Sequence, residues 1–125
     1  MSPRIFIVED EAIIATDIAH RVERFGLEVV GIAARGEDAV MVAHQSQPDA
    51  VLMDIRLAGK MNGIAAAEQI QKSCGAAIIF LTAYSETDIR KKANLTMTFT
   101  CISKPFEDRD LQIALDMAIA KPRES

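Results

Sequence analysis

Short hydrophobic runs alternate with longer stretches of amphipathic pattern from one end of the chain to the other. Each run holds four or five residues, almost all hydrophobic, which is typical of strands that are buried on both faces of a parallel sheet. The pattern therefore predicts five strands. They are expected at Ile5–Val8, Val29–Ala33, Ala50–Met53, Ile78–Leu81 and Phe99–Ile102.

The stretches between the runs predict five helices. Hydrophobic residues recur at helical spacing in the first stretch, acidic residues open the second, and Asn62 is a suitable N-cap for the third. Ser85 and Asp88 have the spacing of a capping box, and Pro122 ends the last helix. The helices are expected from Glu11 to Gly26, over Glu37–Gln45, from Asn62 to Gly75, from Ser85 onward, and over Glu107–Lys121.

Regular alternation of strands and helices predicts an α/β fold, a doubly wound five-stranded parallel sheet with helices on both faces. A chain of 125 residues fits one domain, here expected over 1–121 with a C-terminal tail at 122–125. Ligands of such sheets bind at the carboxyl ends of the strands. The strand ends are therefore where we expect the chemistry.

Composition narrows the class of protein. The net charge is −4, from 18 acidic and 14 basic residues, which argues against direct nucleic-acid binding. Cys74 and Cys101 lack the spacing of a zinc site, and we expect two buried thiols in a reducing compartment. No apolar stretch is long enough for a signal peptide or membrane helix, so a cytoplasmic protein without membrane insertion is expected.

Charged and hydroxyl residues follow the predicted strands. Glu9 and Asp10 follow the first strand, Asp54 the third, Thr82 the fourth and Lys104 the fifth. Two carboxylates about 4 Å apart repel by roughly 4 kcal/mol at an effective dielectric near 20, so a cluster of three favours a hard cation. Mg²⁺ fits best, because it accepts a few carboxylates and bridges to phosphate. Lys104 and Thr82 would then contact phosphoryl oxygens.

Each residue by itself has an ordinary structural explanation. An acidic triplet after a strand is usually a solvated helix N-terminus, and Asp54 alone could be a turn residue or a cap. Thr82 is a common residue at strand ends, and Lys104 could be a surface lysine. The functional interpretation rests on their convergence at one edge of the sheet.

Four segments resemble the receiver domains of two-component response regulators. They are Ile5-Phe6-Ile7-Val8-Glu9-Asp10-Glu11, Pro48-Asp49-Ala50-Val51-Leu52-Met53-Asp54, Leu81-Thr82-Ala83 and Lys104-Pro105-Phe106. The resemblance implies a flavodoxin-like strand order 2-1-3-4-5 and a phosphoryl-accepting switch that is no enzyme beyond slow self-dephosphorylation. It implies that a sensor histidine kinase phosphorylates Asp54, as one step of a phosphorelay. Mg²⁺ would be held by four groups: the carboxylates of Glu9, Asp10 and Asp54 and the backbone carbonyl of Arg56. The phosphoryl oxygens would be bound by Thr82 and Lys104. The Lys104–Pro105 peptide bond would be cis.

The resemblance also suggests a surface for an output domain or a homodimer, formed by the fourth helix, fifth strand and fifth helix. In the last helix, one stripe should be core, namely Leu111, Ala114, Leu115 and Ala118. The other stripe, Ile113, Met117 and Ala120, is either covered by a neighbouring helix or belongs to that surface.

Two departures from the family pattern stand out. The loop from Ile55 to Gly63 lacks the usual proline and is one residue longer, and Cys101 stands where an aromatic residue is usual.

Among alternative functions, a flavodoxin would need a phosphate-binding loop where Glu9-Asp10-Glu11 stands, and no P-loop or dinucleotide-binding motif is present. A Mg²⁺-dependent phosphohydrolase would need a substrate pocket, and the motifs found indicate none beyond the acceptor aspartate itself. A degenerate receiver that binds partners without phosphorylation stays open as the second interpretation.

Overall fold

A computed structural model describes residues 2–55, 62–83 and 99–120. The helix predicted from Ser85 onward and the position of Arg56 lie outside the described residues. The C-terminal tail predicted at 122–125 lies outside them as well.

Five strands form one parallel sheet in the order β2-β1-β3-β4-β5, as the resemblance implied. Every predicted strand is confirmed to within one residue at each end. Their bounds are β1 at Arg4–Val8, β2 at Glu28–Ala33, β3 at Ala50–Met53, β4 at Ala77–Thr82 and β5 at Phe99–Ser103.

Four helices are described, and their ends agree closely with the sequence pattern. The Asn62 side chain accepts a hydrogen bond of 2.9 Å from the backbone N–H of Ala65, which confirms the predicted N-cap. Gly75 ends the same helix with φ of 67°, a conformation that costs glycine little. The helices are α1 at Ala12–Arg24, α2 at Gly36–Ser46, α3 at Gly63–Cys74 and α5 at Asp108–Ala120.

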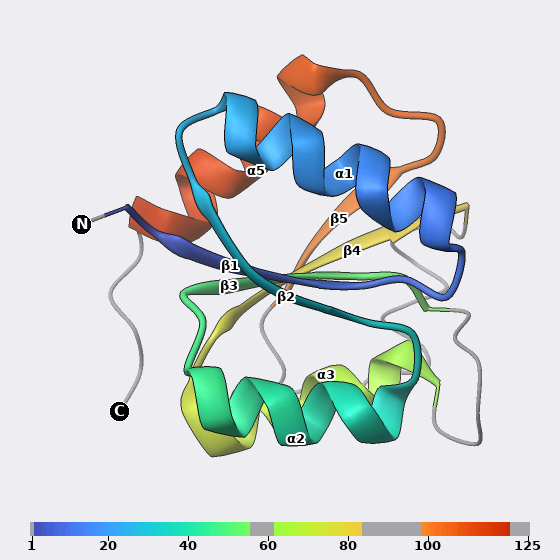
Figure 1. Cartoon of the computed structure of the whole chain (residues 1–125), viewed down its shortest axis with the longest axis vertical. Coiled ribbons are helices and arrows are strands. Elements are labelled where there is room, and N and C mark those ends of the chain that lie inside the picture. The colour runs from blue at the N-terminus through green and yellow to red at the C-terminus, as the bar shows by residue number, and fades with distance from the viewer. Residues whose placement is uncertain (1, 56–61, 84–98, 121–125) are drawn as a thin grey trace.

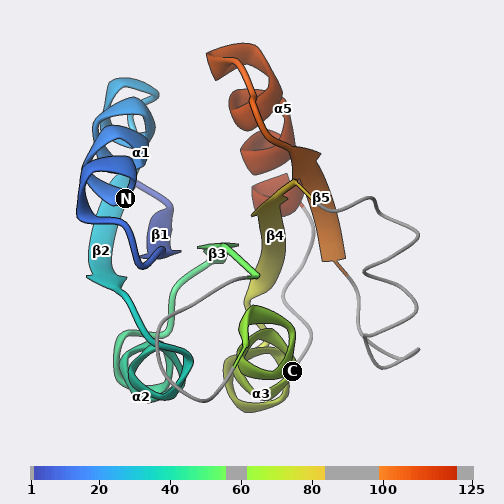
Figure 2. The same cartoon turned by 90° about the vertical axis from the view of Figure 1, so that its right-hand side faces the viewer.

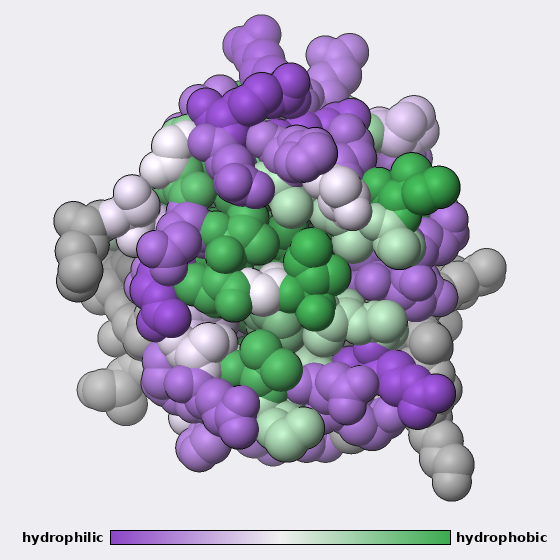
Figure 3. Space-filling view, in the orientation of Figure 1, coloured by the Kyte–Doolittle hydropathy of each residue, from purple (hydrophilic) through white to green (hydrophobic). Residues whose placement is uncertain are grey.

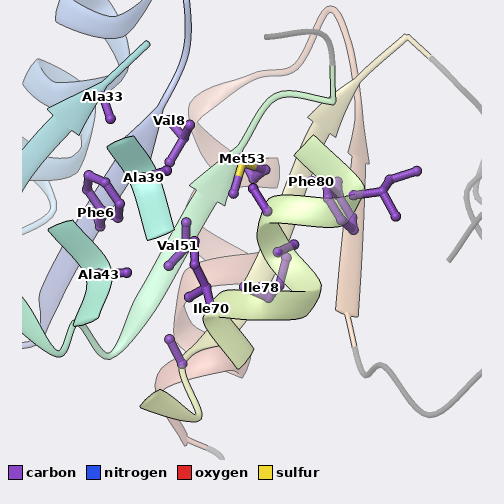
Figure 4. Close-up of a cluster of buried hydrophobic side chains, with 14 of the residues drawn as sticks. Phe6, Val8, Ala33, Ala39, Ala43, Val51, Met53, Ile70, Ile78 and Phe80 are labelled. Carbon is purple, nitrogen blue, oxygen red and sulfur yellow. The ribbon is translucent and has the colours of Figure 1, made fainter. Parts of the chain in front are cut away.

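The sheet lies between two layers of helices, α1 and α5 on one face and α2 and α3 on the other (Figures 1 and 2). Successive residues of the inner strands alternate between two hydrophobic clusters, as the pleat requires. Phe6, Val51 and Phe80 belong to the cluster under α2 and α3 (Figure 4). Ile7, Leu52 and Ile79 belong to the cluster under α1 and α5.

Strand β2 forms one edge of the sheet and leaves part of its hydrophobic surface open. Hydrophobic side chains gather at the centre of the face where β2 crosses in front (Figures 1 and 3). Val29 and Val30 are half-buried, and Ile32 is exposed. The two helices that flank this edge belong to opposite layers, α1 and α2.

Helix α5 buries one of its two predicted stripes. Leu111, Ala114, Leu115 and Ala118 are buried, which confirms the core stripe. Ile113 and Met117 are 49% and 55% exposed, so no described helix covers the second stripe. That stripe therefore stays a candidate contact surface.

One prediction about the thiols needs correction. Cys74 is buried, but Cys101 is only half-buried. Cys101 lies on β5, the last strand of the sheet, so it has a neighbouring strand on one side only among the described residues. It packs with Phe99 against the cluster under α2 and α3, and the Phe99 ring meets the Phe80 ring edge to face at 5.4 Å.

Candidate functional site

Three of the predicted site residues each follow a strand directly, and the backbone N–H of each donates a hydrogen bond to the adjacent strand of the sheet. The backbone N–H of Asp54 donates to the carbonyl of Val8, at 3.0 Å, and that of Glu9 donates to Ala33, at 2.9 Å. The backbone N–H of Lys104 donates to the carbonyl of Thr82, at 2.9 Å. The sheet hydrogen bonding thus continues one residue beyond the strands, and it fixes the backbone from which these side chains project.

The carboxylates of Glu9, Asp10 and Asp54 converge as predicted. One oxygen from each of the three lies within 4.8 Å of the others. Their surroundings differ, because Glu9 is only 3% exposed, Asp54 is partly buried and Asp10 is exposed. The backbone N–H of Glu11, at the start of α1, donates to Glu9 Oε2 at 3.2 Å.

Lys104 reaches the two inner carboxylates. Its Nζ lies 3.0 Å from Asp54 Oδ2 and 3.4 Å from Glu9 Oε1. Burial disfavours the charged ammonium, but the hydrogen bond to Asp54 and the charges of Asp54 and Glu9 outweigh it and raise the pKa of Lys104. The lysine is therefore a fixed positive charge beside the oxygens of Asp54.

Glu9 has an unusual protonation equilibrium for a carboxylic acid. Burial raises the pKa of Glu9 from 4.5 to about 7, and the charge of Asp54 and a hydrogen bond with Asp10 act in the same direction. The N–H of Glu11 and the charge of Lys104 act against this rise. One ammonium thus compensates only part of the negative charge in the cluster.

The donor set suits a hard divalent cation. Carboxylate oxygens are the ligands that Mg²⁺ prefers, and a Mg²⁺ site commonly keeps several waters rather than a full protein shell. The exposed Asp10 leaves the cluster open to solvent, while Glu9 anchors it from the buried side. The residues present therefore fit such an ion.

Thr82 ends β4 and is buried, with 3% of its surface exposed. Its carbonyl holds Lys104, so the two residues of the predicted phosphoryl contacts are joined through the backbone. The Lys104–Pro105 peptide bond is cis, as the resemblance implied. The backbone carbonyl of Arg56, predicted as a further ligand, lies outside the described residues.

Gly63 is a residue of the site whose role the sequence pattern did not reveal. Its backbone N–H donates to the carbonyl of Ile55 at 2.8 Å, which brings the start of α3 against the residues that follow β3. A Cβ at Gly63 would lie 2.2 Å from the carbonyl oxygen of Asp54 and 2.7 Å from the Cα of Ile55. Only a residue without a side chain allows this approach of the two backbones.

We expect Gly63→Ala to lower the free energy of unfolding by at least about 2 kcal/mol, because the backbone of Asp54 must move. Gly31→Ala is a matched control, since a Cβ there meets only side chains at 3.6 and 3.7 Å. The control should stay within about 1 kcal/mol of wild type. Urea unfolding followed by circular dichroism measures both, and equal stability of the two variants would contradict the close approach.

Comparisons with known proteins agree with this geometry. A family model described as the response regulator receiver domain matches residues 5–116. The transcriptional regulatory protein PdtaR of Mycobacterium tuberculosis is 37% identical over 121 residues, which cover 97% of this chain and 58% of that protein. The chain therefore spans little more than half of that relative.

Two solved receiver structures share the fold. The signal receiver domain of a modulated diguanylate cyclase from Desulfovibrio desulfuricans has a TM-score of 0.86 and 31% identity, with 95% of this chain and 94% of that one covered. The receiver domain of a Pseudomonas aeruginosa sensor histidine kinase has a TM-score of 0.82 and 29% identity, with 97% and 100% covered. That structure has a magnesium ion coordinated in its active-site cleft.

In the described part of the chain, no helix combines the length and the apolar character needed to cross a bilayer. The strand order, the acidic cluster at the carboxyl ends of the strands and the family match over residues 5–116 lead to one assignment. The chain belongs to the response regulator receiver domain family of two-component signalling.

Proposed function

We propose that this receiver is a switch that accepts a phosphoryl group on Asp54 from a sensor histidine kinase, in the cytoplasm and in the presence of Mg²⁺. The observation that carries the proposal is the position of Lys104, whose Nζ lies 3.0 Å from Asp54 Oδ2 beside the three clustered carboxylates. A nearby cation stabilises the negative charge that an acceptor carboxylate gains with a phosphoryl group, and Lys104 is such a cation.

The transfer itself requires little covalent chemistry from the protein. One oxygen of Asp54 forms a bond to phosphorus while the bond from phosphorus to the donor's histidine nitrogen breaks and leaves its electron pair on that nitrogen. Lys104 and the hydroxyl of Thr82 stabilise the oxygens of the transferred group through charge and hydrogen bonding. Receivers of response regulators are in general switches rather than enzymes, and slow loss of the phosphoryl group by hydrolysis is the one reaction expected afterwards.

Glu9, Asp10, Asp54 and the backbone carbonyl of Arg56 would hold Mg²⁺. When bound, the ion supplies positive charge that offsets the repulsion between the carboxylates and an incoming phosphoryl group. Burial of Glu9 at the inner side of the cluster keeps one ligand fixed, whereas Asp10 stays accessible to solvent.

Incubation with a small phosphodonor and Mg²⁺, followed by intact-protein mass spectrometry, tests the proposal. Wild-type protein should gain the mass of one phosphoryl group, and Asp54→Asn or an excess of chelator should abolish the gain. Asp116→Asn is a matched control, because Asp116 is an exposed aspartate of α5. It should be labelled like wild type.

A wild-type protein that stays unlabelled with Mg²⁺ present would favour the second interpretation, a receiver that binds its partners without phosphorylation. In either case, an output domain or a second copy could use the surface that includes β5 and the exposed stripe of α5 at Ile113 and Met117.

A further inference from the structure

A cluster of charged and aromatic side chains links α1 to the turn that follows Lys104. At its centre is Arg21 of α1, whose guanidinium carbon lies 5.3 Å from the centroid of the Phe106 ring. Nη1 of Arg21 lies 3.4 Å from the Phe106 carbonyl oxygen, to which it donates, and 3.4 Å from Asp108 Oδ1. The Arg21 side chain therefore contacts the ring and the backbone carbonyl of Phe106 and also Asp108, the first residue of α5.

The guanidinium is held in place from two sides. Nε of Arg21 lies 3.1 Å from Asp17 Oδ2, one turn earlier on the same helix. Asp108 pairs in addition with Arg24, whose Nη2 lies 3.0 Å from its other carboxylate oxygen. The side chain of Arg21 is 25% exposed and that of Arg24 is 63% exposed, so Arg21 is the more enclosed of the two.

Phe106, one member of this cluster, is two residues after Lys104 in the chain. Phe106 is half-buried and packs on the hydrophobic cluster shared by α1 and α5, which lie on the same face of the sheet (Figures 1 and 2). At the other end of the turn, the backbone N–H of Lys104 donates to the Thr82 carbonyl. Only Pro105 separates the two anchored residues.

We propose that Arg21 is a positioning residue for Lys104. By holding the carbonyl and ring of Phe106 against α1, it fixes the far end of the Lys104–Phe106 turn and thereby keeps Lys104 Nζ at the Asp54 carboxylate. The inference rests on the proposed function, because the position of Lys104 matters to a phosphoryl group on Asp54. It adds a residue of α1 whose described contacts are all with residues outside the site.

The simpler explanation is that Arg21 only joins α1 to α5 through Asp108. The chain offers a matched control, because Arg24 pairs with the same Asp108 but makes no described contact with Phe106. Arg21→Lys is a second comparison. It retains a positive charge, but an ammonium lacks the planar group that can lie over a ring and donate sideways to a carbonyl at once.

The first test measures the affinity for beryllofluoride, a phosphoryl mimic, in saturating Mg²⁺. Arg21→Ala should weaken binding about three- to tenfold, Arg21→Lys nearly as much, and Arg24→Ala less than about twofold. In a Lys104→Ala background, Arg21→Ala should change the affinity by less than about twofold, because it acts through that lysine. Equal losses in both backgrounds, or an equal loss from Arg24→Ala, would overturn the proposal.

The second test needs no phosphoryl group. Hydrogen exchange of the Lys104 amide, which is bonded to Thr82, should quicken at least about fivefold in Arg21→Ala and stay unchanged in Arg24→Ala. If wild-type protein binds no beryllofluoride, the proposed function fails, and this exchange alone decides whether Arg21 holds the turn. If Arg21→Ala does not fold, Arg21→Lys takes its place in both tests. An unchanged Lys104 amide would contradict the inference.

Discussion

Without divalent cations, the wild-type protein should lose roughly 3 kcal/mol of unfolding free energy relative to Glu9→Gln as the pH rises from about 4.5 to about 7. The reason is the burial of Glu9, which raises its pKa from 4.5 to about 7. The folded protein then binds a proton at Glu9 that the unfolded chain has already released, so folding is favoured more at low pH.

The sign follows from proton linkage. The contribution of Glu9 is fully favourable below its unfolded pKa of 4.5 and is lost as the pH rises through its folded pKa of about 7. Glutamine has the same shape and no proton to lose in this range, so it removes the effect. The pKa of Lys104 is raised from 10.5, and its charge is therefore constant throughout this window.

Urea unfolding of both proteins at several pH values between 4 and 8, in chelator, measures this difference. The difference in unfolding free energy between wild type and Glu9→Gln should change steadily with pH in the direction given above. Added Mg²⁺ should restore much of the wild-type stability at pH 8 and have little effect on Glu9→Gln, since the variant lacks a carboxylate ligand. A pH-independent difference would show that Glu9 titrates normally in the folded protein.

The second large effect is expected from Lys104→Ala. This variant should still accept a phosphoryl group on Asp54 but should lose most of the conformational response to it. The charge of Lys104 joins the end of β5 to the site through contacts of 3.0 Å to Asp54 and 3.4 Å to Glu9. Without the ammonium, a new charge on Asp54 has no means of drawing the β5 end toward it.

Backbone amide shifts before and after phosphorylation measure this response. In wild-type protein the changes should extend from Asp54 into β5 and the start of α5, whereas in Lys104→Ala they should stay close to Asp54. Lys72→Ala, which removes an exposed lysine of α3, should respond like wild type. A full response in Lys104→Ala would show that the signal leaves the site by another route.

The elements were predictable because local sequence determines them. A parallel strand that is buried on both faces must be hydrophobic on both, so an uninterrupted hydrophobic run such as Ala50–Met53 predicts both the strand and its ends. Asn62 and Gly75 mark the ends of α3 because an N-cap and a left-handed C-cap require particular side chains. The convergence of Glu9, Asp10 and Asp54 followed from the rule that parallel strands end at one edge.

What the sequence could not predict depends on distances between elements. Glu9 and Asp10 are adjacent in the chain, yet Glu9 is buried and Asp10 is exposed. The sequence does not show which of these two side chains, at the end of β1, lies inside the protein. The approach of Gly63 to Asp54 depends on where α3 starts in space. Cys101 was wrongly predicted as buried, because the hydrophobic run suggested burial on both faces, whereas β5 is the last described strand of the sheet, as the implied strand order already required.

The most direct test of the proposed function is to locate the phosphoryl group chemically. An acyl phosphate on an aspartate is reduced by borohydride to homoserine, which marks the residue permanently and can be mapped by peptide mass spectrometry. After incubation with a phosphodonor and Mg²⁺, homoserine should appear at position 54, and it should be absent from chelator-treated protein. Homoserine at Asp10 or at any other aspartate, or none in protein saturated with Mg²⁺, would contradict the assignment of Asp54 as phosphoacceptor.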